Sequence, residues 1–239
     1  MKIAILGYGK MGRIIEKIAQ ERGHNIILKI NQNNLDQLNI YNLKKADVVL
    51  DFSTPESART NIILSIDANT PIISGTTGWL EDYKEVKDYC IKNKGTFLYS
   101  SNFSLGVNLF FELNKNLAKL MKKHHQYQID LTEIHHSQKL DTPSGTAISL
   151  AEQIITESEI KNKWTLRSEN LDEELQINAQ RKGNITGTHS VNYSSETDSI
   201  SIKHEAHSRD GFALGSVIAA EWIISKIGIF SMHDILFSS

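Results

Sequence analysis

Residues 133–147 combine groups that can deliver a proton with groups that can bind an anion. They read Glu-Ile-His-His-Ser-Gln-Lys-Leu-Asp-Thr-Pro-Ser-Gly-Thr-Ala. The adjacent imidazoles of His135 and His136 can supply a proton donor and an anion contact near neutral pH, and Lys139 adds a fixed positive charge. Such a site suits a small acid that must receive a proton during its reaction. The alternative interpretation is a strand, a polar turn and a capped helix without chemistry.

Residues 141–146 within this stretch have the composition of a helix start. The segment Asp-Thr-Pro-Ser-Gly-Thr supplies capping side chains and an early proline. A helix start presents free backbone N–H groups and the positive end of the helix dipole, which together favour an anion. We therefore expect an anion site beside the two histidines.

The N-terminal segment has the pattern of a dinucleotide-binding unit. An apolar run over 2–6 predicts a buried strand, Gly7-Tyr8-Gly9-Lys10-Met11-Gly12 follows at once, and a helical pattern comes next. This is G-x-G-x-x-G between a strand and a helix, the context that the motif requires. Its glycines permit the tight turn, the approach of a pyrophosphate and close helix–strand packing. The alternative is a tight turn that needs glycine for packing alone.

Composition limits the class of protein. At 239 residues the chain can hold one large domain or two modest ones. Its net charge of −2 gives no indication of binding to nucleic acid or to an anionic membrane. The single cysteine, Cys90, excludes an internal disulfide and is expected on the apolar face of a helix, as a small residue of the protein core. The first residues resemble a strand rather than a signal peptide, and we find no apolar run of membrane-spanning length. These features lead us to expect a cytoplasmic protein.

The first hundred residues alternate between strand and helix patterns. Strands are predicted at 2–6, 25–30, 48–52, 71–74 and 96–99, and helices near 11–22, 55–66 and 80–93. Alternation of this kind, with nearly continuous apolar strands, predicts a parallel sheet with helices on both faces. The segment 31–47 is polar and short, so we expect an abbreviated second crossover.

The pattern changes beyond residue 104. A long amphipathic helix is predicted over 104–124 and should carry the chain out of the first domain. Residues 127–135 alternate as a strand, and 185–193 and 199–207 are expected to form a hairpin, so we predict a mixed or antiparallel second sheet. The polar segment 158–182 has only a weak helical pattern near 171–180. A final helix is predicted over 212–227.

Small or polar side chains follow several predicted strands of the first domain. They comprise Asp51 and Ser53, the loop Gly75-Thr76-Thr77-Gly78, and Ser101-Asn102-Phe103-Ser104. Ligands bind at the carboxyl ends of strands in this architecture, so these loops can approach a ribose or close a nicotinamide pocket. Each could instead be a capping cluster or an ordinary polar loop. Arg181 could likewise close over an anionic substrate, although a solvated basic turn is the simpler interpretation.

These motifs together resemble the 4-hydroxy-tetrahydrodipicolinate reductase family, also called dihydrodipicolinate reductase, of the diaminopimelate–lysine pathway. The most specific match is E-x-H-H-x-x-K-x-D-x-P-S-G-T-A over residues 133–147. The D-F-S-x-P, G-T-T-G and N-F-S-x-G-V-N elements match at 51–55, 75–78 and 102–108. The resemblance extends from residue 2 to about residue 222.

The resemblance implies an α/β protein with a Rossmann-type parallel sheet and a second α+β domain built on a mixed sheet. It implies that residues 1–104, completed by a C-terminal helix within 211–239, bind NADPH or NADH. Residues 105–210 would bind substrate and build a homotetramer. His135 would be the catalytic proton donor and Lys139 a second catalytic residue, with no metal. The implied substrate contacts are His136, Gly145 and Thr146. The implied cofactor contacts are Gly7, Tyr8, Gly9, Lys10, Met11, Gly12, Gly75, Thr76, Thr77, Ser100, Ser101, Asn102 and Phe103.

The chain departs from the family pattern at two places. Its glycine loop is one residue shorter than G-x-x-G-R-M-G, with Lys10 in the place of the arginine. After the second strand, where the family often has an acidic residue that holds the adenosine ribose, this chain has Asn31-Gln32-Asn33. Without that carboxylate a 2′-phosphate is not repelled, so NADPH becomes more acceptable.

The implied reaction is the reduction of a cyclic unsaturated dicarboxylate with loss of water, in which the cofactor supplies the hydride and the protein supplies orientation, charge neutralisation and a proton. Two alternatives remain open. One is another nicotinamide-dependent reductase of a small amino or imino acid. The other is a nucleotide-sensing protein without turnover, for which the cluster of His135 and Lys139 would be dispensable.

Overall fold

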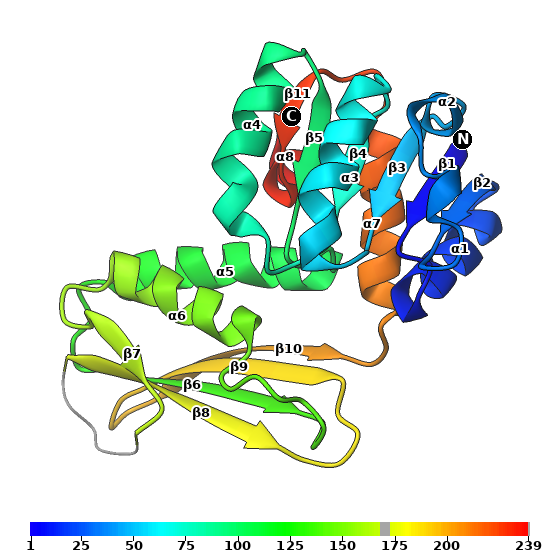
Figure 1. Cartoon of the computed structure of the whole chain (residues 1–239). Coiled ribbons are helices and arrows are strands. Elements are labelled where there is room, and N and C mark those ends of the chain that lie inside the picture. The colour runs from blue at the N-terminus through cyan, green and yellow to red at the C-terminus, as the bar shows by residue number, and fades with distance from the viewer. Residues whose placement is uncertain (168–172, 239) are drawn as a thin grey trace. The chain divides into compact units, whose positions relative to one another are not determined.

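The computed structural model describes residues 1–167 and 173–238, and the chain divides into two compact units (Figure 1). The first unit comprises Met1–Leu105 together with Asp210–Ser239, and the second comprises Gly106–Arg209. The chain thus leaves the first unit at the start of one helix and returns to it at the start of another.

The first unit is built on a parallel six-stranded sheet in the order β2-β1-β3-β4-β5-β11. Its strands are β1 (Lys2–Leu6), β2 (Asn25–Ile30), β3 (Val48–Asp51), β4 (Ile72–Ser74), β5 (Thr96–Tyr99) and β11 (Gly228–Phe230). The central strands β1 and β3 are almost wholly buried, because helices cover both faces. The prediction of a Rossmann-type parallel sheet from its apolar runs is confirmed.

Helices pack on both faces of this sheet (Figure 1). One face carries α1 (Lys10–Glu21) and α7 (Asp210–Ile223), and the other carries α3 (Pro55–Asp67) and α4 (Tyr83–Lys92). Cys90 of α4 is fully buried, as the sequence predicts, and burial raises the pKa of its thiol to about 11. An apolar environment of this kind makes the thiol a packing residue.

The connection between β2 and β3 holds only two short helical segments, 3₁₀ helix η1 (Leu35–Gln37) and α2 (Ile40–Leu43). The prediction of an abbreviated crossover is therefore confirmed. Since β2 and β3 flank β1 on opposite sides, the strand order reverses between β1 and β3. A doubly wound sheet binds its ligand at such a switch point, outside the carboxyl ends of the strands.

The second unit is built on a mixed five-stranded sheet in the order β10-β9-β6-β8-β7. Its strands are β6 (Gln128–His135), β7 (Lys163–Thr165), β8 (Glu174–Arg181), β9 (Gly187–Ser194) and β10 (Ser199–Ala206). Strand β6 pairs parallel with β8 and antiparallel with β9, and β9 and β10 form the predicted hairpin. Helices α5 (Leu105–Met121) and α6 (Gly145–Glu157) cover one face of this sheet, and the opposite face is bare in Figure 1.

Two predicted helices are wrong in part. Residues 174–180 form strand β8 rather than a helix, while 171 and 172 lie outside the described residues. Leu175 and Ile177 are buried in the sheet core, so pairing with β6 overrides the weak helical pattern. The final helix ends at Ile223, and the chain then adds edge strand β11 and helix α8 (Met232–Phe237) to the first unit.

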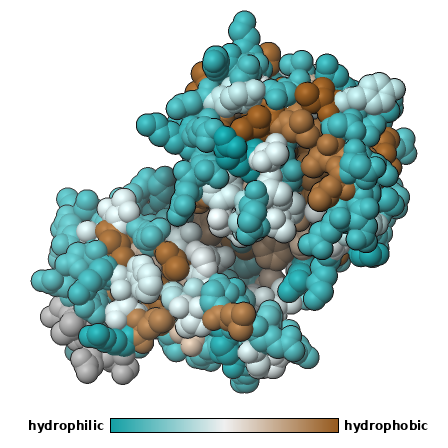
Figure 2. Space-filling view, viewed as in Figure 1, coloured by the Kyte–Doolittle hydropathy of each residue, from teal (hydrophilic) through white to brown (hydrophobic). Residues whose placement is uncertain are grey.

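No helix in the described part of the chain is both long and apolar enough to span a membrane. Hydrophilic residues cover most of the face shown in Figure 2, and the hydrophobic ones visible there lie mainly on the first unit. Isolated apolar side chains on a protein surface are ordinary.

Candidate active site

The second sheet brings together side chains that are far apart in the sequence. In the register of β6, His189 of β9 lies opposite Glu133, and Arg181 of β8 lies opposite His135. Successive side chains of a strand alternate between faces, so Glu133 and His135 share the face that α5 and α6 cover, with buried Leu131 next along the strand. The predicted alternation of 127–135 is therefore what builds this cluster.

Glu133 is the centre of the cluster and is completely buried. Its Oε2 accepts a short hydrogen bond from Nδ1 of His135. Its Oε1 accepts from Nη2 of Arg181 and from the backbone N–H of Ser144, both at 3.0 Å. Burial alone would raise the pKa of Glu133, but the hydrogen bonds from His135, Arg181 and Ser144 outweigh it and lower the pKa to about 2. The carboxylate is therefore ionised at neutral pH.

His189 belongs to the same cluster, although sequence reasoning did not select it. Its ring lies 5.1 Å from the ring of His135, centroid to centroid, and its Nε2 lies 3.1 Å from Oγ of Ser144. Burial, together with the positive charge of a protonated His135, lowers the pKa of His189 to about 3, so its ring is neutral. Glu133, His135 and His189 are also close enough to hold a metal ion, but the Glu133 oxygens already accept from three donors.

The loop after β6 leads to the predicted helix start. Helix α6 begins at Gly145, and Ser144 is its N-cap, whose Oγ accepts from the N–H of Ala147. Pro143 precedes the N-cap rather than occupying the first turn. The backbone N–H groups of Gly145 and Thr146 have no partner within the first turn of a helix, so the N-terminal end of α6 can receive an anion beside Glu133 and His189.

Lys139 lies in the loop between β6 and α6 with about a fifth of its side chain exposed, and its Nζ donates to both oxygens of Asp141, at 2.7 and 2.8 Å. The half-buried His136 directly follows β6. Arg181 ties this loop to the cluster, because its Nη2 also donates to the carbonyl of Asp141 at 2.6 Å. The interpretation of Arg181 as a solvated basic turn is thus wrong, since its side chain is 18% exposed and paired with Glu133.

The glycine loop of the first unit forms one end of a groove at the sheet's switch point. The groove has a volume of about 550 Å³, within the range of small-molecule sites. Its lining includes Gly7 and Gly9 after β1, Asn31 after β2, and Phe52 and Ser53 after β3. Gly7 has a φ of +88°, and a Cβ there would lie 2.1 Å from the carbonyl oxygen of Phe52, so this turn requires glycine.

This groove fits a dinucleotide. Helix α1 begins at Lys10 without a side-chain cap on Gly9, and within the described residues nothing lies within 4 Å of a Cβ placed on Gly9. The exposed helix start can therefore receive a phosphate. Gly12 packs closely against the carbonyl of Gly7, as the motif predicts, while Lys10 is exposed and Met11 half-buried at the start of α1.

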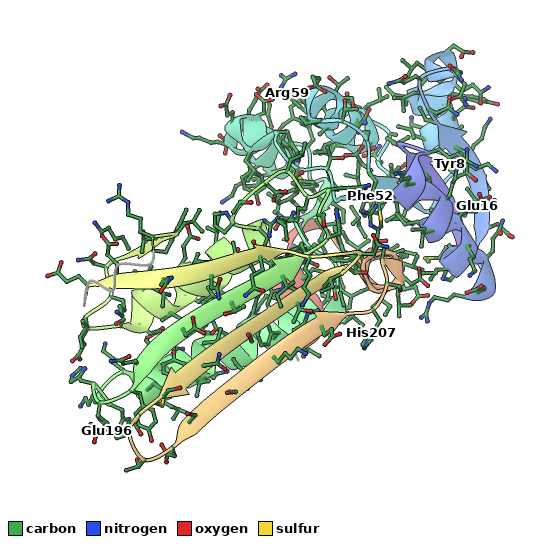
Figure 3. The ribbon with its side chains drawn as sticks, turned by 90° about the horizontal axis from the view of Figure 1, so that it is seen from below. Tyr8, Glu16, Phe52, Arg59, Glu196 and His207 are labelled. Atoms are coloured by element: carbon green, nitrogen blue, oxygen red, sulfur yellow. The ribbon has the colours of Figure 1, made fainter. Side chains whose placement is uncertain are left out.

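Tyr8 connects the glycine loop with a small group of charged side chains. Its hydroxyl donates a short hydrogen bond to Glu16 of α1, which also accepts from Nζ of Lys29 at 3.1 Å (Tyr8 and Glu16 are labelled in Figure 3). The guanidinium of Arg13 and the ammonium of Lys29 lie about 5 Å from the centre of the Tyr8 ring, at 5.2 and 5.0 Å. Two cations thus lie beside Tyr8, which lines the groove.

Asp51, at the end of β3, organises the loops at the carboxyl edge of this sheet. The carboxylate is fully buried and accepts hydrogen bonds from side chains of α3 and of the strand ends of β3 and β4. The donors are Ser53 Oγ at 2.6 Å, Asn61 Nδ2 at 2.9 Å, Ser74 Oγ at 2.8 Å and Thr76 Oγ1 at 2.9 Å. Thr76 is itself buried, and its hydroxyl also accepts from the N–H of Ser53. Its side chain therefore braces the loops.

The other predicted cofactor residues follow neighbouring strands at the same edge. Gly75 and the exposed Thr77 come after β4. Ser100, Ser101, Asn102 and Phe103 come after β5, where Oγ of Ser100 donates to the carbonyl of Asn102 at 2.7 Å. The Phe103 ring lies 5.8 Å from that of Phe52, centroid to centroid. The structure thus gathers these residues with the glycine loop at one edge of one sheet.

Comparison with known proteins covers both units. The family profile described as dihydrodipicolinate reductase, N-terminus, matches residues 1–103, and the profile for its C-terminus matches residues 106–236. The chain belongs to the dihydrodipicolinate reductase family. It is 48% identical over 238 residues to the 4-hydroxy-tetrahydrodipicolinate reductase of Christiangramia forsetii, covering 99% of this chain and 98% of the relative. The enzyme of the same name from Rickettsia rickettsii is 36% identical over 95% of both chains.

A solved structure shares the fold of this family member. It is the dipicolinate-bound dihydrodipicolinate reductase from Paenisporosarcina sp. TG-14, with a TM-score of 0.78, 21% identity and 99% coverage of both chains. An aspartate dehydrogenase from Thermotoga maritima is less similar, with a TM-score of 0.51 at 13% identity. The resemblance stated from the motifs is thus confirmed at the level of the family and of the fold.

Proposed function

We propose that this chain catalyses the reduction of 4-hydroxy-tetrahydrodipicolinate to tetrahydrodipicolinate, with NADPH or NADH as reductant and with loss of water, in diaminopimelate and lysine biosynthesis. The observation that carries the proposal is the full-length 48% identity to a relative of that name. The chemistry of the two units supports it, because one offers a dinucleotide groove and the other a proton donor beside an anion site.

His135 is the proposed proton donor. Its Nδ1 is bonded to Glu133, so Nε2 is the nitrogen that can give a proton to substrate. Lys139 is the proposed second catalytic group. Its present partner Asp141 is 61% exposed, and an exposed ion pair is worth at most about 1 kcal/mol, so a substrate carboxylate can displace it. His136 and the helix start at Gly145 and Thr146 complete the proposed contacts to the two substrate carboxylates.

The first unit is the proposed binding domain for the cofactor. The residues that would hold it are Gly7, Tyr8, Gly9, Lys10, Met11 and Gly12 at the start of α1, Gly75, Thr76 and Thr77 after β4, and Ser100, Ser101, Asn102 and Phe103 after β5. The reduced nicotinamide, when bound, supplies the hydride that adds to the substrate ring. The chain's own residues orient substrate, neutralise its charge and deliver the accompanying proton.

We further propose that the protein is a cytoplasmic homotetramer, assembled through the second unit. Among the described residues of that unit, helices cover one face of the sheet. Alternate residues of β6 and β8 on the other face, such as Thr132, Ile134 and Asn178, are polar or only partly buried. A second copy could pair with that face. Native mass spectrometry at micromolar concentration would detect four copies, and a monomer would contradict the proposal.

The reaction is tested with purified protein, substrate generated by the preceding synthase reaction, and NADPH or NADH. Oxidation of the cofactor should depend on substrate, and mass spectrometry should detect tetrahydrodipicolinate. His135→Gln should lower kcat by about 10²-fold or more while NADPH affinity stays nearly constant. The matched control is His125→Gln, because the His125 side chain is half exposed. Turnover of a different imino acid alone would favour another reductase, and binding of cofactor without any turnover would favour a sensor.

A further inference from the structure

The contacts of Glu133 determine how His135 presents its proton. Glu133 is ionised and can only accept, so its short bond to His135 places a proton on Nδ1 of that ring. The other ring nitrogen, Nε2, lies beside Gly187 of β9, where an added Cβ would be only 3.0 Å away. Glycine at 187 thus leaves room at Nε2, and the His135 side chain retains 10% exposure.

Arg181 holds Glu133 in place and, together with His135 and Ser144, keeps it charged. Its Nη2 donates to Glu133 Oε1 and to Oγ1 of Thr142, both at 3.0 Å, as well as to the carbonyl of Asp141. A buried carboxylate without such partners would favour its protonated form. The guanidinium therefore joins the carboxylate behind His135 to the loop that carries Lys139.

Two other titratable groups near His135 do not compete for this carboxylate. His189 of β9 is neutral, and Lys139 is paired with Asp141. Among the described residues of the second unit, Glu133 is thus the one anion hydrogen-bonded to His135, and Arg181 is the one cation on Glu133 besides a protonated His135. This arrangement differs from a simple structural ion pair, because it includes the proposed proton donor.

We propose that Glu133 is a positioning residue for His135: it holds the ring with Nδ1 protonated and Nε2 facing substrate, and it stabilises the imidazolium, while Arg181 holds Glu133. The inference rests on the proposed function, in which His135 is the proton donor. The proton leaves from Nε2 to the substrate, the ring becomes neutral with its Nδ1–H still bound to Glu133, and water returns the proton to Nε2 afterwards. A carboxylate that orients an imidazole in this way supports general acid catalysis without changing its own protonation.

Kinetics of Glu133→Gln as a function of pH provide the first test. The variant should lower kcat about ten-fold or more with KM nearly constant, and the pH above which activity is lost should move down by about one unit or more, since the imidazolium has lost its counter-ion. Glu133→Asp keeps the charge and should retain the pH limit of the wild type even if kcat falls. The matched control is Asp130→Asn, because Asp130 lies on the same strand, three residues before Glu133, but is exposed.

Nitrogen-15 NMR of the histidine side chains provides a test that does not need turnover. At a pH where the ring is neutral, His135 should show the Nδ1–H tautomer in the wild type, assigned by its loss in His135→Gln, and a changed tautomer in Glu133→Gln. At lower pH a smaller fraction of the ring should be protonated in Glu133→Gln than in the wild type. A structural role alone predicts a lower melting temperature with the pH limit and the tautomer unchanged, and that result would overturn the proposal. If the wild type does not reduce the substrate at all, the proposed function fails, whereas an active wild type with an unaltered Glu133→Gln variant rejects only the positioning role.

Discussion

The ammonium of Lys139 lies 2.7 and 2.8 Å from the two oxygens of Asp141, two residues further along the same loop. The lysine thus binds a carboxylate of its own loop. This carboxylate is mostly exposed, and Lys139 lowers the pKa of Asp141. We therefore expect a carboxylate of the substrate to replace that of Asp141 on Lys139.

Lys139→Ala should weaken binding of the dicarboxylate and also slow its reduction. Loss of one charged hydrogen bond costs about 1.5–3 kcal/mol, so KM should rise roughly ten-fold or more, and kcat should fall because a misplaced ring reacts slowly. Binding of pyridine-2,6-dicarboxylate measured by calorimetry checks the first effect. Lys163→Ala is a suitable control, since Lys163 on edge strand β7 forms an ion pair of the same 2.7 Å length with Glu174 of β8. Equal binding by wild type and Lys139→Ala would reject the anion site.

The buried cluster should make the second unit sensitive to acid. Glu133 has a folded pKa of about 2 against an ordinary 4.5, so its ionised form stabilises the fold above pH 4.5 and this contribution disappears as the pH falls toward 2. His189 has a folded pKa of about 3 against an ordinary 6.5, so stability declines already as the pH falls below 6.5, where the unfolded chain takes up a proton that the folded chain excludes.

His189→Gln should flatten the pH dependence of the unfolding free energy between about pH 6.5 and 4.5. One excluded proton corresponds to about 1.4 kcal/mol per pH unit, so urea unfolding at several pH values would detect the change in slope. His125→Gln serves again as the exposed control. Parallel curves for wild type and His189→Gln would show that His189 is not held neutral in the fold.

Asp51 should matter for stability and for the cofactor together. Asp51→Asn keeps the shape of the side chain but replaces one acceptor oxygen with an NH₂ donor. That donor would face the hydroxyl groups of Ser53 and Thr76, which donate to Asp51 in the wild type. The expected loss is about 1–3 kcal/mol of unfolding free energy, with weaker NADPH binding because Thr76 and Ser53 are no longer held. Asp47→Asn is the control, since exposed Asp47 accepts one backbone bond, from Lys2. A variant as stable and as tight for NADPH as this control would contradict the bracing role.

The cofactor preference should depend on Asn31. Its side chain lines the groove after β2, and its Oδ1 accepts from the N–H of Asn33 at 2.8 Å. We expect NADPH to be used at least as well as NADH, because no carboxylate at this place repels a 2′-phosphate and Arg13 and Lys29 lie nearby. Asn31→Asp or Asn31→Glu should shift kcat/KM toward NADH. A strong NADH preference in the wild type would show that another residue recognises the ribose.

The local sequence pattern was sufficient to predict most of the helices and strands of the first unit. The strands β1, β3, β4 and β5 are apolar because helices bury both sheet faces, whereas edge strand β2 is only partly buried. Strand β8 was less accessible to prediction, since Leu175 and Ile177 alternate within a polar segment whose partner strand β6 is distant in the sequence. Strand β11 has three residues and exists through its pairing with the edge of β5. Neither pairing leaves a local signal.

The sequence by itself determined the family, the dinucleotide motif, and the placing of His135, Lys139 and the α6 start in one continuous stretch, because these depend on residue type and short spacing. Only the tertiary structure decided that Arg181, 48 residues from Glu133, and His189 join that stretch. The register of β6 between β8 and β9 sets these neighbours, and burial then keeps the His189 ring neutral. Both depend on strand pairings between distant segments, so a lone arginine or histidine in the sequence carries no sign of them.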